Sequence, residues 1–229
     1  QEDYVTRHDF NVAGFNTNPG GQLEFGLSYL EKPQRTDAHS GWAITAQHVQ
    51  SEFLGGKNKL ALQYGEGSGT GLGYTGDTRL DNSSKRYRIV EFFDWQVTPR
   101  FGGQVEAVYQ KDFRPDGGNQ EWLSLGVRPT YAITEQFKLV TEFGHDQVRA
   151  PDGTRKLSKF TFAPTWSPNG PSFWARPEIR LYYTYASWNA AAQRAANEFD
   201  AGSALSDSGA FGSARHGSNA GVQIEYWWK

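Results

Sequence analysis

Apolar and polar residues alternate along most of the chain, which is the pattern of β-strands that have one apolar and one polar face. In QLEFGLSYL, for example, Leu23, Phe25 and Leu27 share a face opposite Gln22 and Glu24. The same period of two recurs in many segments and predicts an all-β protein. The predicted strands are residues 5–16, 22–31, 41–53, 58–66, 85–97, 101–111, 120–132, 137–147, 156–166, 174–188 and 218–228.

The connectors between these predicted strands alternate in length. Short turns such as NPGG, TPR, TEQ and SPNGPS stand between longer loops, of which the longest are 67–84 and 189–217. Loop 189–217 contains AAAQRAANEF, the segment that most favours a short helix. Outer-membrane β-barrels have short turns at the periplasmic end and long loops outside. The alternation therefore favours such a barrel over a soluble β-sandwich.

The two faces of the predicted strands support the same choice. Charged residues occupy alternate positions, as Arg86 and Arg88 do on one strand, and a sandwich core cannot bury so many charges. A water-filled lumen can hold them. The opposite faces form a predicted apolar band that would contact lipid, with aromatic residues at its margins and Trp228 at the periplasmic interface. This band includes Leu23, Phe25, Leu123, Leu125, Phe160, Phe162, Ile179, Leu181 and Ile224.

Composition excludes several classes of protein. The net charge of −2 provides no basic surface for nucleic acid. The absence of cysteine excludes disulfides, thiol catalysis and cysteine-based zinc sites. No stretch approaches the length of a transmembrane helix, and the opening QEDYVTRHDF lacks the features of a signal peptide.

Candidate catalytic and ligand-binding motifs are weak. The pairs His8–Asp9 and His145–Asp146 are adjacent on predicted strands, so their side chains point to opposite faces and neither forms a dyad alone. The glycine-rich GEGSGTGLGYTG follows a strand but precedes no helix, which favours a flexible loop over a phosphate site. We expect no metal, no cofactor and no enzymatic activity, and keep a barrel enzyme as a minor alternative.

Several longer segments carry a family resemblance: NPGGQLEFGLSY, GWAITAQHVQS, LSLGVRPTY, SFWARPEIRLYYTYASW and the ending VQIEYWW. They resemble, in the same order, segments of the maltoporin and sucrose-porin family of outer-membrane sugar porins. The resemblance covers the carboxy-terminal half to two-thirds of a family member. It implies an antiparallel transmembrane β-barrel in the bacterial outer membrane. Family members have about eighteen strands and form homotrimers, and sugars cross them passively along a row of aromatic side chains.

The resemblance also suggests site residues. Trp174 in FWARP and Trp227 in YWWK match two aromatic residues of that row, and both fall on the polar face of the predicted strands, as the row requires. Girdle or lumen-filling roles are the alternative for both. Lys57 stands where maltoporins have phenylalanine, which puts the lower end of the row in doubt. The candidates for polar contacts in the lumen are Arg176, Glu178, Arg180, Arg128, Glu106 and Lys57. For the first three, a charge ladder that neutralises itself is the favoured alternative.

The implied function is a pore for passive diffusion of maltodextrin, sucrose or other small sugars, surrounded by outer-membrane lipid. The alternative is an engineered or truncated structural barrel with a narrow lumen and little transport, because only about ten or eleven strands are predicted. We treat residues 1–229 as a single barrel domain, in which 1–16 form either the first strand or a peripheral segment. Upstream strands supplied elsewhere are a further alternative.

The alternation of connectors predicts the topology in the membrane. Protease added to intact cells that display the chain is expected to cut within 67–84 and 189–217 and to leave the TPR and TEQ turns intact. Fragment masses measure the sites of cleavage, and permeabilised cells serve as the control in which both sets are reached. Cleavage at TPR or TEQ in intact cells contradicts the topology.

Overall fold

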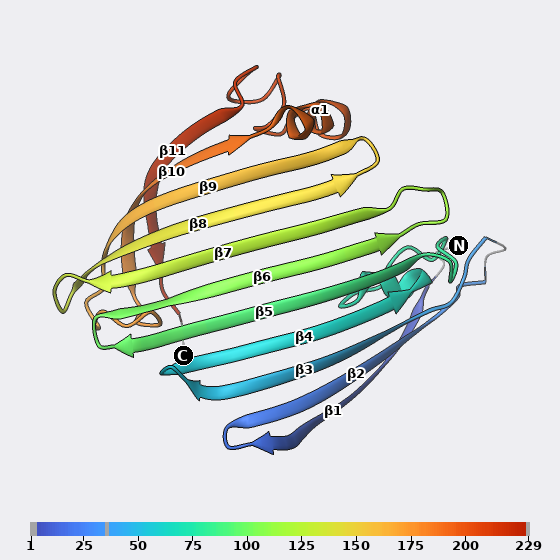
Figure 1. Cartoon of the computed structure of the whole chain (residues 1–229), viewed down its shortest axis with the longest axis horizontal. Helices are drawn as coiled ribbons and strands as arrows, with labels where there is room; N and C mark the ends of the chain where they lie inside the picture. The colour runs from blue at the N-terminus through green and yellow to red at the C-terminus, as the bar shows by residue number, and fades with distance from the viewer. Residues whose placement is uncertain (1–3, 35–36, 228–229) are drawn as a thin grey trace. The chain divides into compact units, whose positions relative to one another are not determined.

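The computed structural model describes residues 4–34 and 37–227, and within these ranges the chain forms eleven strands in one sheet whose order follows the sequence (Figure 1). The first six strands are β1 (Thr6–Asn18), β2 (Gly21–Glu31), β3 (Gly41–Phe53), β4 (Gly56–Glu66), β5 (Lys85–Thr98) and β6 (Phe101–Phe113). The others are β7 (Gln120–Ala132), β8 (Phe137–Ala150), β9 (Gly153–Trp166), β10 (Glu178–Trp188) and β11 (His216–Glu225). A 3₁₀ helix, η1 (Gly67–Gly71), and an α-helix, α1 (Ala190–Phe199), lie in connectors.

The sequence pattern predicted these elements closely, and the all-β prediction is confirmed. The first strand belongs to the sheet, since β1 pairs antiparallel with β2 from Thr6↔Glu31 onward. The predicted boundaries lie within four residues of the observed ones, and two of the differences bear on the site. β10 begins at Glu178 rather than at Trp174, and β11 ends at Glu225 rather than at Trp228, which lies outside the described residues. Pro177 explains the first error, because proline has no N–H for the strand ladder and restricts the residue before it.

One face of the sheet is apolar and open. The exposed large side chains include most of the predicted apolar band, from Phe25 and Phe162 at 43% exposure to Ile224 at 71%. The other face is polar and its side chains are partnered. Arg86 Nε lies 2.6 Å from Asp112 Oδ1, and Arg88 donates to Gln110 at 2.8 Å. A sheet with these two faces fits lipid on one side and water on the other.

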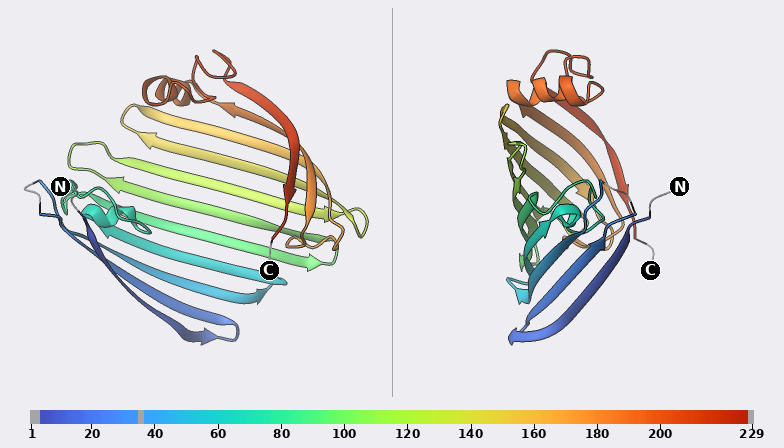
Figure 2. Two further views of the ribbon diagram at one scale, coloured as in Figure 1. Left: turned by 180° about the vertical axis from the view of Figure 1, so that it is seen from behind. Right: turned by 90° about the vertical axis from the view of Figure 1, so that its right-hand side faces the viewer.

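Contacts divide the chain into two compact units. The first centres on β1–β4 and contains η1; the second contains β8–β11 and α1. In the second unit, α1 lies beside the start of β9 and the end of β10 (Figure 2). Asn189 caps this helix, because its Oδ1 accepts from Ala192 N at 3.0 Å and from Lys156 N at 3.1 Å. Neither helix of the described part has the length and apolar character needed to cross a bilayer.

In the first unit, the glycine-rich segment is packed rather than loose. All five residues of η1 are buried. A Cβ atom on Gly69 would lie 1.9 Å from the Trp42 carbonyl oxygen, and one on Gly41 would lie 2.5 Å from Gly69 N. Arg86 Nη1 donates to the Thr70 carbonyl oxygen at 2.9 Å. Glycine is needed here for close backbone approach, so the expectation of a flexible loop is wrong for Gly67–Gly71.

The assignment of faces predicts the effect of a buried charge. Leu125 is 43% exposed on the apolar face. Leu125→Arg is expected to lower the free energy of unfolding by about 2–4 kcal/mol if the site lies near the bilayer midplane. Ser124→Arg, one residue away on the polar face, is the matched control and is expected to cost less. Urea titration in phospholipid vesicles measures both. Equal losses in the two variants contradict the assignment.

Candidate functional site

Trp174 and Trp227 form an aromatic pair in the second unit. Their ring centroids are 5.9 Å apart with an interplanar angle of 43°. Trp174 is 47% exposed and Trp227 46% exposed. Both residues lie outside the strands, Trp174 in the connector from β9 to β10 and Trp227 after β11. The expectation that they lie on the polar face of strands is therefore wrong, although the structure brings the two together.

Polar groups contact both rings, one at its edge and the other at its face. Trp174 Nε1 donates to Asp94 Oδ2 at 3.1 Å. Asp94 Oδ1 also accepts from the backbone N–H of Lys57 at 3.2 Å. The Arg176 guanidinium lies over the Trp227 ring, 4.5 Å from its centroid, which is a cation–π contact. The structure thus brings Trp174, Trp227 and the backbone of Lys57 together, through Asp94 and the contact between the two rings.

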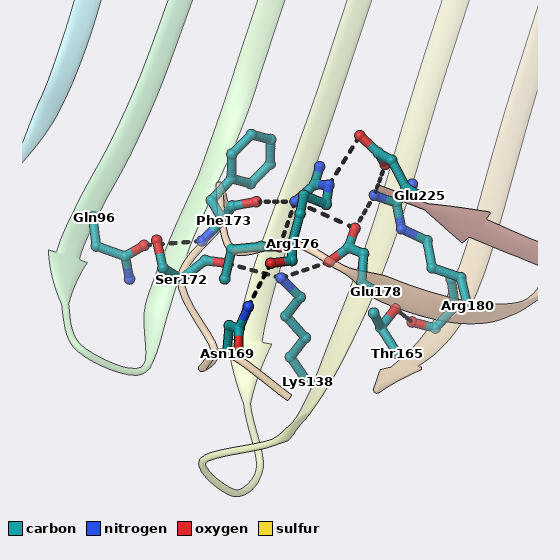
Figure 3. A network of polar contacts seen from close by, with 12 residues as sticks. Gln96, Lys138, Thr165, Asn169, Ser172, Phe173, Arg176, Glu178, Arg180 and Glu225 are labelled. Atoms are coloured by element: carbon teal, nitrogen blue, oxygen red, sulfur yellow. Dashed lines mark hydrogen bonds and ion pairs between the residues drawn. The ribbon is translucent and has the colours of Figure 1, made fainter. Parts of the chain in front are cut away.

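The connector that carries Trp174 is tied down by hydrogen bonds to its backbone (Figure 3). Lys138 Nζ on β8 donates to the Ser172 carbonyl oxygen at 2.8 Å. Gln96 on β5 accepts from Phe173 N at 3.3 Å, and Asn169 Nδ2 donates to the Arg176 carbonyl oxygen at 2.8 Å. These bonds replace the ladder that the connector lacks and fix the position of the indole.

Behind the connector lies a buried ion cluster (Figure 3). Lys138 Nζ lies 2.8 Å from Glu178 Oε2, and both side chains are 1% exposed. Glu178 also pairs with Arg176 at 3.5 Å and with Arg180. Glu225 on β11 completes the cluster, at 2.9 Å from Arg176 and 2.6 Å from Arg180. Every charge has an opposite partner, as a buried ionic group requires.

The structure separates the polar candidates into two groups. Arg176, Glu178 and Arg180 belong to the ion cluster and are at most 9% exposed in their side chains. This arrangement agrees with the favoured interpretation of charges that neutralise one another, and contact of these three residues with a sugar stays a prediction. The other candidates are more open. Arg128 and Glu142 pair at 2.6 Å with 36% and 43% exposed side chains.

The last two candidates, Glu106 on β6 and Lys57 on β4, are exposed strand residues. Glu106 accepts a hydrogen bond from Gln104, and both line a hollow of about 130 Å³ together with Arg128 and Glu142. The side chain of Lys57 is exposed. Its contact with Asp94 is a hydrogen bond from the backbone N–H. A sugar-binding role for these residues stays a prediction.

Sequence reasoning missed the part that Lys138 plays. The alternation along β8 did indicate that Lys138 lies on the polar face, because it is four residues from Glu142 on the same strand. Its partner was not visible, because Glu178 comes beside Lys138 only through the pairing of β8 with β9 and of β9 with β10. Gln96 was missed for the same reason, as its partner is the backbone of a distant connector.

Comparison with known families agrees with the fold. A family model described as LamB porin matches residues 1–228 of the chain. The match spans all eleven strands of the described part and both helices. It confirms the resemblance to outer-membrane sugar porins that the sequence segments indicated.

The ion cluster makes a quantitative prediction about stability. Glu178→Gln is expected to lower the free energy of unfolding by about 3–5 kcal/mol, because it leaves buried cations short of a carboxylate. The matched control is Glu142→Gln, which breaks a half-exposed pair and is expected to cost about 0–1 kcal/mol. Unfolding by urea in phospholipid vesicles measures both. A similar small loss in both variants contradicts the structural role of Glu178.

Proposed function

Because the chain belongs to the LamB porin family, we propose that it lines an outer-membrane channel through which sugars such as maltodextrins or sucrose diffuse passively. The family is one of channels, so we propose no catalytic role. The apolar face of the sheet contacts outer-membrane lipid, and the polar face contacts water and solute. In this proposal residues 1–229 act as one barrel domain, and homotrimers form as in the family.

The observation that carries the proposal is the exposed pair Trp174–Trp227. A sugar ring has an apolar face and a rim of hydroxyl groups, and aromatic faces suit the first while polar neighbours suit the second. The two indoles offer adjoining apolar surface at 5.9 Å between centroids. Asp94 contacts the edge of the Trp174 ring and Arg176 covers one face of the Trp227 ring, so both add charge beside that surface.

The buried cluster supports this pair indirectly. Arg176 contacts both Glu225 and the Trp227 ring, and Lys138 holds the connector beside Trp174. Charges that are paired with one another in a dry site are poor partners for a mobile solute. We therefore assign the cluster to positioning, and assign contacts with sugar hydroxyls to the more open Arg128, Glu142 and Glu106.

A second candidate function is a structural barrel with little transport. It is favoured by the eleven strands of the described part, compared with about eighteen in the family. The lumen of a closed barrel narrows as strand number falls, and about eight strands leave room only for side chains. A lone chain that closes with eleven strands would then conduct ions weakly and bind maltodextrin poorly.

Planar bilayer recording distinguishes the two candidates. In a sugar channel, maltohexaose is expected to reduce the ion current in a saturable way. Trp174→Ala is expected to weaken this block by about two- to tenfold, because one aromatic contact is lost. Trp166→Ala is the matched control, since Trp166 is 41% exposed on the apolar face. Low conductance without block in the parent chain refutes the sugar channel and supports the structural barrel.

A further inference from the structure

A second hollow lies on the polar face of the second unit, on the sheet rather than on the connector. Its volume is about 200 Å³, and β7–β11 supply its lining. The floor is apolar, because Val140 and Ala163 are adjacent in the register of β8 and β9 and are only 7% and 3% exposed. Tyr182 on β10 adds an aromatic ring to this floor. The function proposed above does not use this ring.

The position of the Tyr182 ring depends on a glycine. Tyr182 pairs with Gly221 across β10 and β11. A Cβ atom on Gly221 would lie 2.7 Å from the Tyr182 hydroxyl oxygen and 2.9 Å from Cζ. The ring therefore rests on the backbone of β11, where only glycine leaves room for it. A ring supported on one side in this way presents its other side to the hollow.

The rim of the hollow is polar and its charges are balanced. Arg128 Nη2 lies 2.6 Å from Glu142 Oε2, so the cation is already neutralised. The hydroxyl groups of Thr161 and Thr184 lie 2.7 Å apart, and the side chain of Gln223 lines the opposite part. Arg180 also lines the hollow, and its charge is neutralised by Glu178 and Glu225. The rim therefore offers both donors and acceptors, and its charges are already paired. It suits a neutral solute with many hydroxyl groups better than it suits an anion.

From this combination we propose that the hollow is a further sugar-binding subsite, in which Tyr182 stacks against a sugar ring. Glu142 and Gln223 then bond its hydroxyl groups. The inference rests on the proposed function, because it places a second contact along the same channel. Gly221, the partner of Tyr182, is four residues from Glu225 at the end of β11, which corresponds to roughly 13 Å of strand, and Trp227 follows two residues later. An oligosaccharide held at Trp174 and Trp227 spans this separation, whereas a disaccharide held there is too short.

The length of the sugar therefore tests the subsite. Binding of maltose and of maltohexaose to the full chain, refolded in detergent, is measured by titration calorimetry. Tyr182→Ala is expected to weaken the binding of maltohexaose by about two- to tenfold and to change the binding of maltose by less than about twofold. Tyr182→Phe keeps the ring and is expected to bind both sugars as the parent does. Tyr183→Ala is the matched control, because Tyr183 is 49% exposed on the apolar face.

Each outcome has one interpretation. Parent binding of both sugars with no effect of Tyr182→Ala, or with equal loss for both sugars, overturns the subsite and leaves the proposed function intact. Failure of the parent chain to bind either sugar refutes the proposed function and the subsite together. Gln223→Leu is a second variant for the case in which Tyr182→Ala does not fold, as judged by circular dichroism. It is expected to show the same dependence on sugar length, and the absence of that dependence overturns the subsite.

Discussion

Hydrocarbon offers no hydrogen-bond partner, so backbone groups at membrane depth have to be satisfied within the protein. In the described part of this chain each strand pairs with its sequence neighbours, and the sheet ladder meets that demand on both sides of β2–β10. Side chains on the two faces then meet different media. On β10, Leu181 is 58% exposed on one face, whereas Arg180, the adjacent residue, is 7% exposed on the other. The strict alternation of the sequence follows from this requirement.

The site depends on a place where the ladder stops. Pro177 ends the regular pattern before β10, and the connector needs other partners for its carbonyl and N–H groups. Lys138 and Gln96 supply two of them through side chains. The carboxylate of Glu178, which lies 2.8 Å from Lys138 Nζ, in turn pairs with this cation in a dry environment. Interruption of the sheet thus allows an indole to be placed where a regular strand would not put it.

The sequence predicted the strands, their faces and the helix at 190–199 because each depends on local periodicity. The resemblance singled out Trp174 and Trp227, and the structure places them beside each other. The prediction that Trp174 lies in a strand was wrong, since the alternation in WARPEIRLYYTY begins at Trp174 whereas β10 begins only after Pro177, at Glu178. The partners of Lys138 depend on how separate strands are aligned, which no local pattern specifies.

The packing of the glycine-rich segment likewise could not be predicted from local sequence. Its composition is also that of a mobile linker, and only the contacts of Gly69 with Trp42 and of Gly41 with Gly69 reveal dense packing. The same reasoning applies to Gly221, which reads as a weak position in a strand. Its role becomes clear only when Tyr182 is seen to occupy the space above it.

The dryness of the ion cluster has a consequence for the environments in which the protein can work. Mobile ions screen interactions between solvated charges, with a screening length of about 10 Å at 0.1 M salt that shortens as salt rises, but they act much less on buried pairs. Lys138 and Glu178 are each 1% exposed in their side chains. The geometry of the tryptophan pair therefore persists from fresh water to brine, while the open Arg128–Glu142 pair on the polar face of the sheet loosens as salinity rises.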